Sequence, residues 1–152
     1  PKAIREQVGG EFEVDVHAPV HQVAEAIEPV QRAVEAREEV RTLERIQESL
    51  PERGVWGVEH VIDAINQRRV MTVAVDDAFQ VAGGYCAHCD LLVLDASKPC
   101  PACGNPVEAE SDIIDRALEM ALAQDATIEL VRSEAARTLM AQHAPMGALL
   151  RF

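Results

Sequence analysis

The chain has 152 residues, enough to bury one hydrophobic core of ordinary size. Hydrophobic residues make up 48% and charged residues 26%, and no apolar run approaches the roughly 18 residues of a membrane span, which disfavours disordered and membrane-embedded classes. The 14 Lys and Arg against 26 Asp and Glu give a net charge of -12, which argues against bulk nucleic-acid affinity. Because the chain begins at Pro1 rather than Met, we expect it to be a piece of a longer protein.

The first predicted elements are a strand followed by a long helix. Polar and apolar side chains alternate over residues 11–16, which predicts a half-buried strand. From Val20 to Leu50 the apolar residues repeat at helical spacing among Glu and Arg, with a kink or break expected at Pro29. We therefore expect residues 1–18 to contain the trailing strand of a preceding middle domain and residues 19–152 to form the main domain.

The rest of the chain alternates predicted helices and strands, which indicates a layered α/β domain rather than a helical bundle. Ser111 and Ser133 are expected to act as N-caps of two of the helices. The predicted elements are a helix over 58–65, a strand over 70–75, a helix over 111–124, a strand over 126–131, a helix over 133–143, a turn over 144–147 and a strand over 148–152.

All four cysteines lie within residues 86–103, in two Cys-x-x-Cys pairs separated by a segment with strand character. Each pair on a tight turn directs two thiolates towards one point, and two facing turns supply four tetrahedral ligands for Zn²⁺. We therefore predict a zinc ribbon over about 84–108. The predicted zinc ligands are Cys86, Cys89, Cys100 and Cys103.

Two disulfides or a redox-active dithiol are the alternatives, but disulfides belong to oxidising compartments and the chain otherwise has an intracellular character. His88 lies inside the first pair and competes as a ligand, although four cysteines already complete the shell. A closed four-cysteine site leaves no position for a reactive water, so we expect a structural rather than a catalytic metal.

Three segments carry a resemblance to a known family. They are Trp56–Val70 followed by a Val-rich strand, Asp125–Val131 and the closing Met146–Phe152. Together with the paired cysteines, which archaeal members carry as an insertion at the corresponding place, they resemble the C-terminal domain of the archaeal and eukaryotic type of class-1 peptide chain release factor. The resemblance runs from about Thr42 to the end of the chain, and residues 11–41 resemble the end of the family's middle domain and the helix that follows.

The resemblance implies an α/β fold, an α-β-α sandwich like that of the kink-turn-binding ribosomal proteins, with the zinc ribbon as an outgrowth. It also implies a cytoplasmic, ribosome-associated docking module that engages a translational GTPase and later a recycling ATPase. In the family, peptidyl-tRNA hydrolysis belongs to a Gly-Gly-Gln loop of the middle domain. Here Gly9 and Gly10 precede Glu11, so we expect this chain to have no catalytic residues and no enzymatic activity of its own.

We predict the docking surface at Met146, Gly147 and Arg151, because Gly allows close backbone approach, Met adapts to a partner and Arg is a multi-donor anchor. An ordinary core strand over 148–152 is the alternative at this place. For the whole domain, the alternatives are a structured-RNA binder of the ribosomal-protein type, which the acidic charge disfavours, and a zinc ribbon with a polymerase or replication partner.

Overall fold

A four-stranded sheet lies at the centre of the structure, a computed structural model that describes residues 10–152. Its strands, in spatial order, are β1 (Gly54–Trp56), β7 (Met146–Leu150), β2 (Val70–Asp76) and β6 (Thr127–Val131). β2 and β6 run parallel, whereas β7 is antiparallel to β1 and β2. Because parallel neighbours need a long crossover connection, the segment between β2 and β6 has room for a second sheet and a helix.

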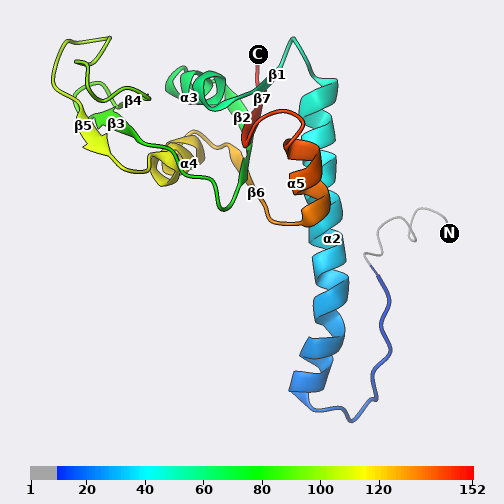
Figure 1. Cartoon of the computed structure of the whole chain (residues 1–152). Helices are drawn as coiled ribbons and strands as arrows, with labels where there is room; N and C mark the ends of the chain where they lie inside the picture. Colours follow the sequence, from blue (N-terminus) through cyan, green and yellow to red (C-terminus); the bar gives the residue numbers. More distant parts are fainter. Residues whose placement is uncertain (1–9) are drawn as a thin grey trace.

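The second sheet is small and antiparallel. It consists of β3 (Gly83–Cys86), β4 (Leu91–Val93) and β5 (Glu108–Glu110), in the spatial order β4-β3-β5. The sheet lies beside the central layers, at one end of the molecule (Figure 1). This confirms the inserted, ribbon-like unit as part of the fold, and its strands begin at Gly83 and end at Glu110.

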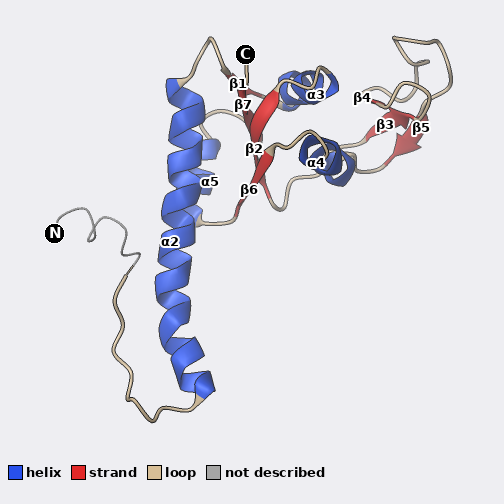
Figure 2. Cartoon of the chain, turned by 180° about the vertical axis from the view of Figure 1, so that it is seen from behind, coloured by secondary structure: helices blue, strands red, loops and turns tan. Residues whose placement is uncertain are grey.

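Helices cover both faces of the central sheet (Figure 2). The helices α2 (Val20–Glu48) and α5 (Glu134–Met140) pack on one face. The helices α3 (Val58–Asn66) and α4 (Ile114–Leu122) pack on the other face. The central strand β2 is buried on both sides, which explains its apolar run, interrupted before Asp76 by Thr72 alone. The predicted α-β-α sandwich is thereby confirmed.

Several predicted elements need correction at their ends. The Ser133 side chain accepts a hydrogen bond from the backbone N–H of Ala136, as expected of an N-cap. Ser111 does not cap α4; instead Asp112 Oδ1 accepts the backbone N–H of Ile114 at 3.0 Å. The last strand is β7 at Met146–Leu150 rather than 148–152, because the expected turn at 144–147 is shorter by two residues.

The N-terminal part of the described chain also differs from the prediction. Residues 11–16 form no strand, and no strand within residues 10–152 lies paired with them. Side-chain alternation alone does not make a strand, because the backbone hydrogen bonds need a neighbour. Residues 1–9 lie outside the described part, so the assignment of 1–18 to a preceding domain stays a prediction.

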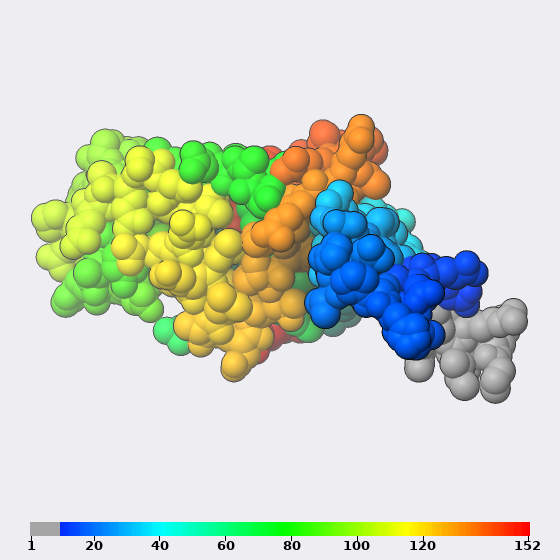
Figure 3. All heavy atoms as spheres, turned by 90° about the horizontal axis from the view of Figure 1, so that it is seen from below, coloured from blue at the N-terminus to red at the C-terminus, as the bar shows by residue number. Residues whose placement is uncertain are grey.

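Helix α2 continues through Pro29 without a break. Proline removes one backbone donor and leaves the carbonyl of Glu25 without its helical partner. Both residues are exposed, so water can solvate that carbonyl. The buried residues of α2 all lie in its C-terminal half (Glu39, Leu43 and Ile46). The first half projects away from the sheet (Figure 1) and points towards the viewer in Figure 3, which looks along the helix from below.

Candidate metal centre

The two cysteine pairs lie on turns at the end of the small sheet. Cys86 ends β3, and the backbone N–H of Cys89 donates a hydrogen bond to the Cys86 carbonyl at 3.2 Å. In the second turn the N–H of Gly104 donates to the Cys100 carbonyl at 2.9 Å. Gly104 has a φ of 73°, a left-handed conformation that glycine adopts without strain. Local backbone geometry thus turns each pair of thiols inward.

The four thiols converge on one point. Their Sγ atoms all lie within 4.8 Å of one another, and Cys86 Sγ and Cys103 Sγ are 3.7 Å apart. In a tetrahedron with metal–sulfur bonds of about 2.3 Å, neighbouring sulfurs are about 3.8 Å apart. All four cysteines are free, and two of them are buried. The donor set therefore fits a tetrahedral, thiophilic metal ion.

The surroundings make the four thiols unequal as acids. The backbone N–H of Asn105 lowers the pKa of Cys103 to about 6, because it stabilises the thiolate. The hydrogen bond with Cys103, followed by desolvation, raises the pKa of Cys89 to about 12. A divalent cation at this point would favour all four thiolates together, so its binding would release protons. His88 is exposed and is not part of the converging group.

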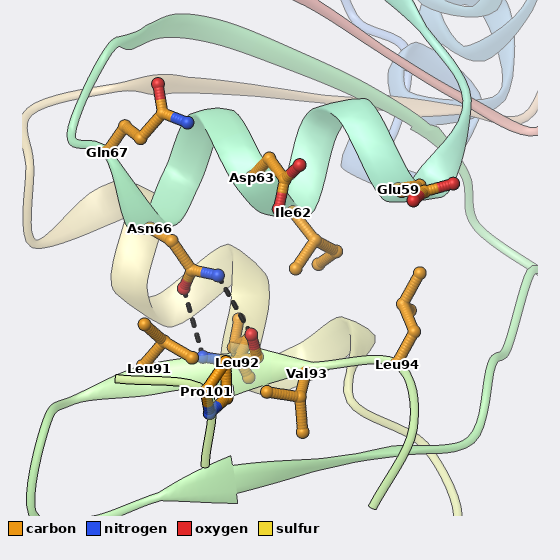
Figure 4. A pocket seen from close by; sticks show the side chains of 10 residues that line it. All are labelled: Glu59, Ile62, Asp63, Asn66, Gln67, Leu91, Leu92, Val93, Leu94 and Pro101. Atoms are coloured by element: carbon orange, nitrogen blue, oxygen red, sulfur yellow. Dashed lines mark hydrogen bonds between the residues drawn. The ribbon is translucent and has the colours of Figure 1, made fainter. Parts of the chain in front are cut away.

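The amide side chain of Asn66 is one of the groups that join the small sheet to the sandwich. Asn66, at the end of α3, donates from Nδ2 to the Leu92 carbonyl at 2.8 Å and accepts the Leu92 N–H on Oδ1 at 3.0 Å (Figure 4). The Leu92 side chain is 1% exposed and belongs to the core cluster shared with α3 and α4. The small sheet is held against the domain by this pair of hydrogen bonds and by the buried leucine. It is also held by Arg116 of α4, which forms an ion pair with Glu110 of β5 at 2.6 Å and lies over the Tyr85 ring of β3.

Replacing Asn66 with alanine is expected to loosen this attachment. Both Leu92 backbone groups lose their partner, which costs about 2 kcal/mol of local stability. Amide hydrogen exchange in β4 should then accelerate, while exchange in β2 changes little. Gln67→Ala, one residue further along at an exposed position, is the matched control. Unchanged protection of β4 in Asn66→Ala would contradict the attachment.

The three residues predicted to dock a partner are not brought together on a surface. Met146 is 0% exposed, because it begins the central strand β7. Gly147 lies under the Trp56 ring, where an added Cβ would be 2.6 Å from a ring carbon. Arg151 donates from Nε to the Val70 carbonyl at 2.9 Å and from a second nitrogen to the Gln124 carbonyl. The glycine therefore serves packing within the sheet, and the arginine ties the chain end to the neighbouring backbone.

The sequence matches no protein-family model and no curated protein. Among solved structures, the fold is similar to the C-terminal domain of a peptide chain release factor from Methanosarcina mazei, with a TM-score of 0.60, 20% identity, and coverage of 91% of this chain and 96% of that one. It is also similar to Pelota from Archaeoglobus fulgidus, with a TM-score of 0.53 and 20% identity over 91% of this chain, which spans 39% of the Pelota chain. The resemblance carried by the sequence motifs is confirmed at the level of the fold.

Proposed function

We propose that this chain is a translation-associated binding module, which docks a ribosome-linked GTPase or another translation factor during termination or ribosome rescue. The observation that carries the proposal is the fold, which is similar to a release-factor C-terminal domain over 96% of that domain. Sequence motifs in three separate segments support it independently. The proposed unit is residues 19–152, and the proposed location is the cytoplasm, where ribosomes work.

We further propose that Cys86, Cys89, Cys100 and Cys103 hold one Zn²⁺ ion. Four converging thiols support zinc, because thiolates and tetrahedral geometry suit this ion. Bound zinc would supply cross-linking of the two turns. With four protein ligands the shell is closed, so the proposed role is structural.

The chain is proposed to have no hydrolytic activity of its own. The sequence contains no Gly-Gly-Gln loop, and in the described residues the only converging group of potential metal ligands is the cysteine set. Incubation with a peptidyl-tRNA on ribosomes is therefore expected to release peptide at the buffer rate. Release above that rate would contradict the assignment.

Binding to ribosomes and to a purified translational GTPase tests the docking role directly. Co-sedimentation with ribosomes, or capture by the GTPase, is the expected result, and an unrelated acidic protein of similar size is the control. The RNA-binding alternative predicts instead tight, strongly salt-dependent binding to a purified kink-turn RNA. Absence of binding to both ribosomes and the GTPase would overturn the proposal.

A further inference from the structure

A groove runs between α3 and strand β4 of the small sheet (Figure 4). Its volume is about 410 Å³, within the range of sites that bind ligands or inserted side chains. The wall is mostly apolar, and Leu94 is a large apolar side chain that is 37% exposed. The apolar residues that line the groove are Ile62, Leu91, Leu92, Val93, Leu94 and Pro101.

Two carboxylates lie along the rim of this groove. Glu59 and Asp63 are four residues apart in α3, so they share one face of the helix, and both are exposed. Within residues 10–152, neither side chain forms an ion pair or a side-chain hydrogen bond. The lining contains no Lys or Arg. The rim therefore presents two uncompensated negative charges in a chain whose net charge is -12.

The backbone along the groove is closed to strand addition. β4 is an edge strand of three residues, and alternate residues of an antiparallel strand turn their N–H and C=O to opposite sides. The middle residue, Leu92, gives both of its outward groups to Asn66. An extended peptide therefore cannot pair with the backbone of β4 at this edge. A ligand in the groove must be bound through the ligand's own side chains.

We infer that this groove binds an amphipathic, basic helix of a protein partner. The apolar face of that helix enters the groove, and Lys or Arg one turn apart face Glu59 and Asp63. The inference rests on the proposed docking role and adds the surface and the chemistry of the partner. Pro101 belongs to the second cysteine turn, so one wall of the groove depends on the folded ribbon.

A phage-displayed library of helical peptides of about 15 residues tests the inference on the zinc-loaded chain. Peptides enriched on this chain are expected to carry apolar residues flanked by Lys or Arg. The double variant E59K/D63K should bind them about tenfold more weakly, with a reduced dependence on salt. E44K/E48K is the matched control, because it changes the net charge equally at the same spacing on an exposed face of α2.

A second pair of variants tests the apolar wall. Leu94→Ser should lower the affinity for the enriched peptides severalfold. Leu122→Ser, at a 57% exposed leucine on α4, should leave that affinity unchanged. Circular dichroism and zinc content verify that each variant is folded. The inference is overturned if no peptide is enriched, if acidic peptides are enriched, or if both charge variants bind equally.

Ribosome and GTPase binding separate this inference from the proposed function. If E59K/D63K binds both as the unaltered chain does, the groove is not the docking surface, although the docking role stands. If the unaltered chain binds neither while basic helices still occupy the groove, the translational role fails and the groove stands. Competition by an RNA as effective as that by the basic peptides would also overturn the inference.

Discussion

Replacing Cys100 with serine is expected to abolish stoichiometric zinc binding and to unfold the small sheet while the α-β-α sandwich stays folded. Cys100 is 2% exposed and is one of the four converging thiols. Structural zinc stabilises small domains by about 10–16 kcal/mol, far more than a sheet of three short strands supplies alone. The sandwich has its own core of apolar side chains from four helices and four strands, to which the small sheet contributes chiefly Leu92.

Elemental analysis and hydrogen exchange give the two readouts. Zinc should fall from one ion per chain to a small fraction, and amides of β3 to β5 should exchange rapidly while those of β2 and β7 stay protected. Ala102→Ser is the matched control, because this exposed residue lies between two of the cysteines without supplying a ligand. Full zinc content in Cys100→Ser, or global unfolding of the sandwich, would contradict the expected independence.

Replacing Glu39 with alanine is expected to destabilise the sandwich by about 3 kcal/mol. Glu39 is 5% exposed, and its Oε2 accepts the backbone N–H groups of Arg132 at 3.1 Å and Ser133 at 2.9 Å. These groups lie at the start of α5, where a carboxylate also interacts favourably with the helix dipole. Alanine leaves both donors without their acceptor beneath α2. Chemical denaturation monitored by circular dichroism measures the loss.

Glu38→Ala provides the contrast for this prediction. Glu38 forms an exposed ion pair with Arg41, so its loss is expected to cost under about 0.5 kcal/mol. The stability loss in Glu39→Gln should lie between those of Glu38→Ala and Glu39→Ala, because glutamine keeps an acceptor oxygen but not the charge. The pKa of Glu129 is raised mainly by desolvation and further by the nearby negative charge of Glu39. The pKa of Glu129 should therefore fall in Glu39→Ala. Equal stability losses in Glu38→Ala and Glu39→Ala would refute the capping role.

The features that could be predicted from the sequence are those set by nearby residues. Each Cys-x-x-Cys turn fixes its own geometry, and the segment after the first turn folds back as β4 onto β3. The convergence of Cys86 with Cys103, which are 17 positions apart, was therefore predictable from the spacing of the two pairs. The layered fold follows from periodicity, because the helices carry apolar residues three and four apart and β2 is almost entirely apolar. Ser133 was identifiable as a cap because it immediately precedes its helix.

The features that sequence analysis missed depend on partners far along the chain. Asn66 meets Leu92 across the groove, and Glu39 meets Ser133 across 94 positions, so neither pairing leaves a local pattern. The strand β1 has three residues and no alternation long enough to detect. Met146 was misread because a short strand buried on both faces resembles a turn followed by an apolar segment.

The projecting half of α2 has a mechanical consequence for the segment that precedes it. An uninterrupted helix of 29 residues is about 43 Å long, because each residue adds about 1.5 Å. It also fixes direction, since each residue turns the chain by about 100° about the axis. Removing one residue between Val20 and Pro29 would rotate the preceding residues by about 100° about the helix axis, to another side of the domain. Removing about seven residues, close to two full turns, would shorten the helix and leave that orientation nearly unchanged. The length of α2 thus sets both the distance and the rotational orientation of the residues that precede it.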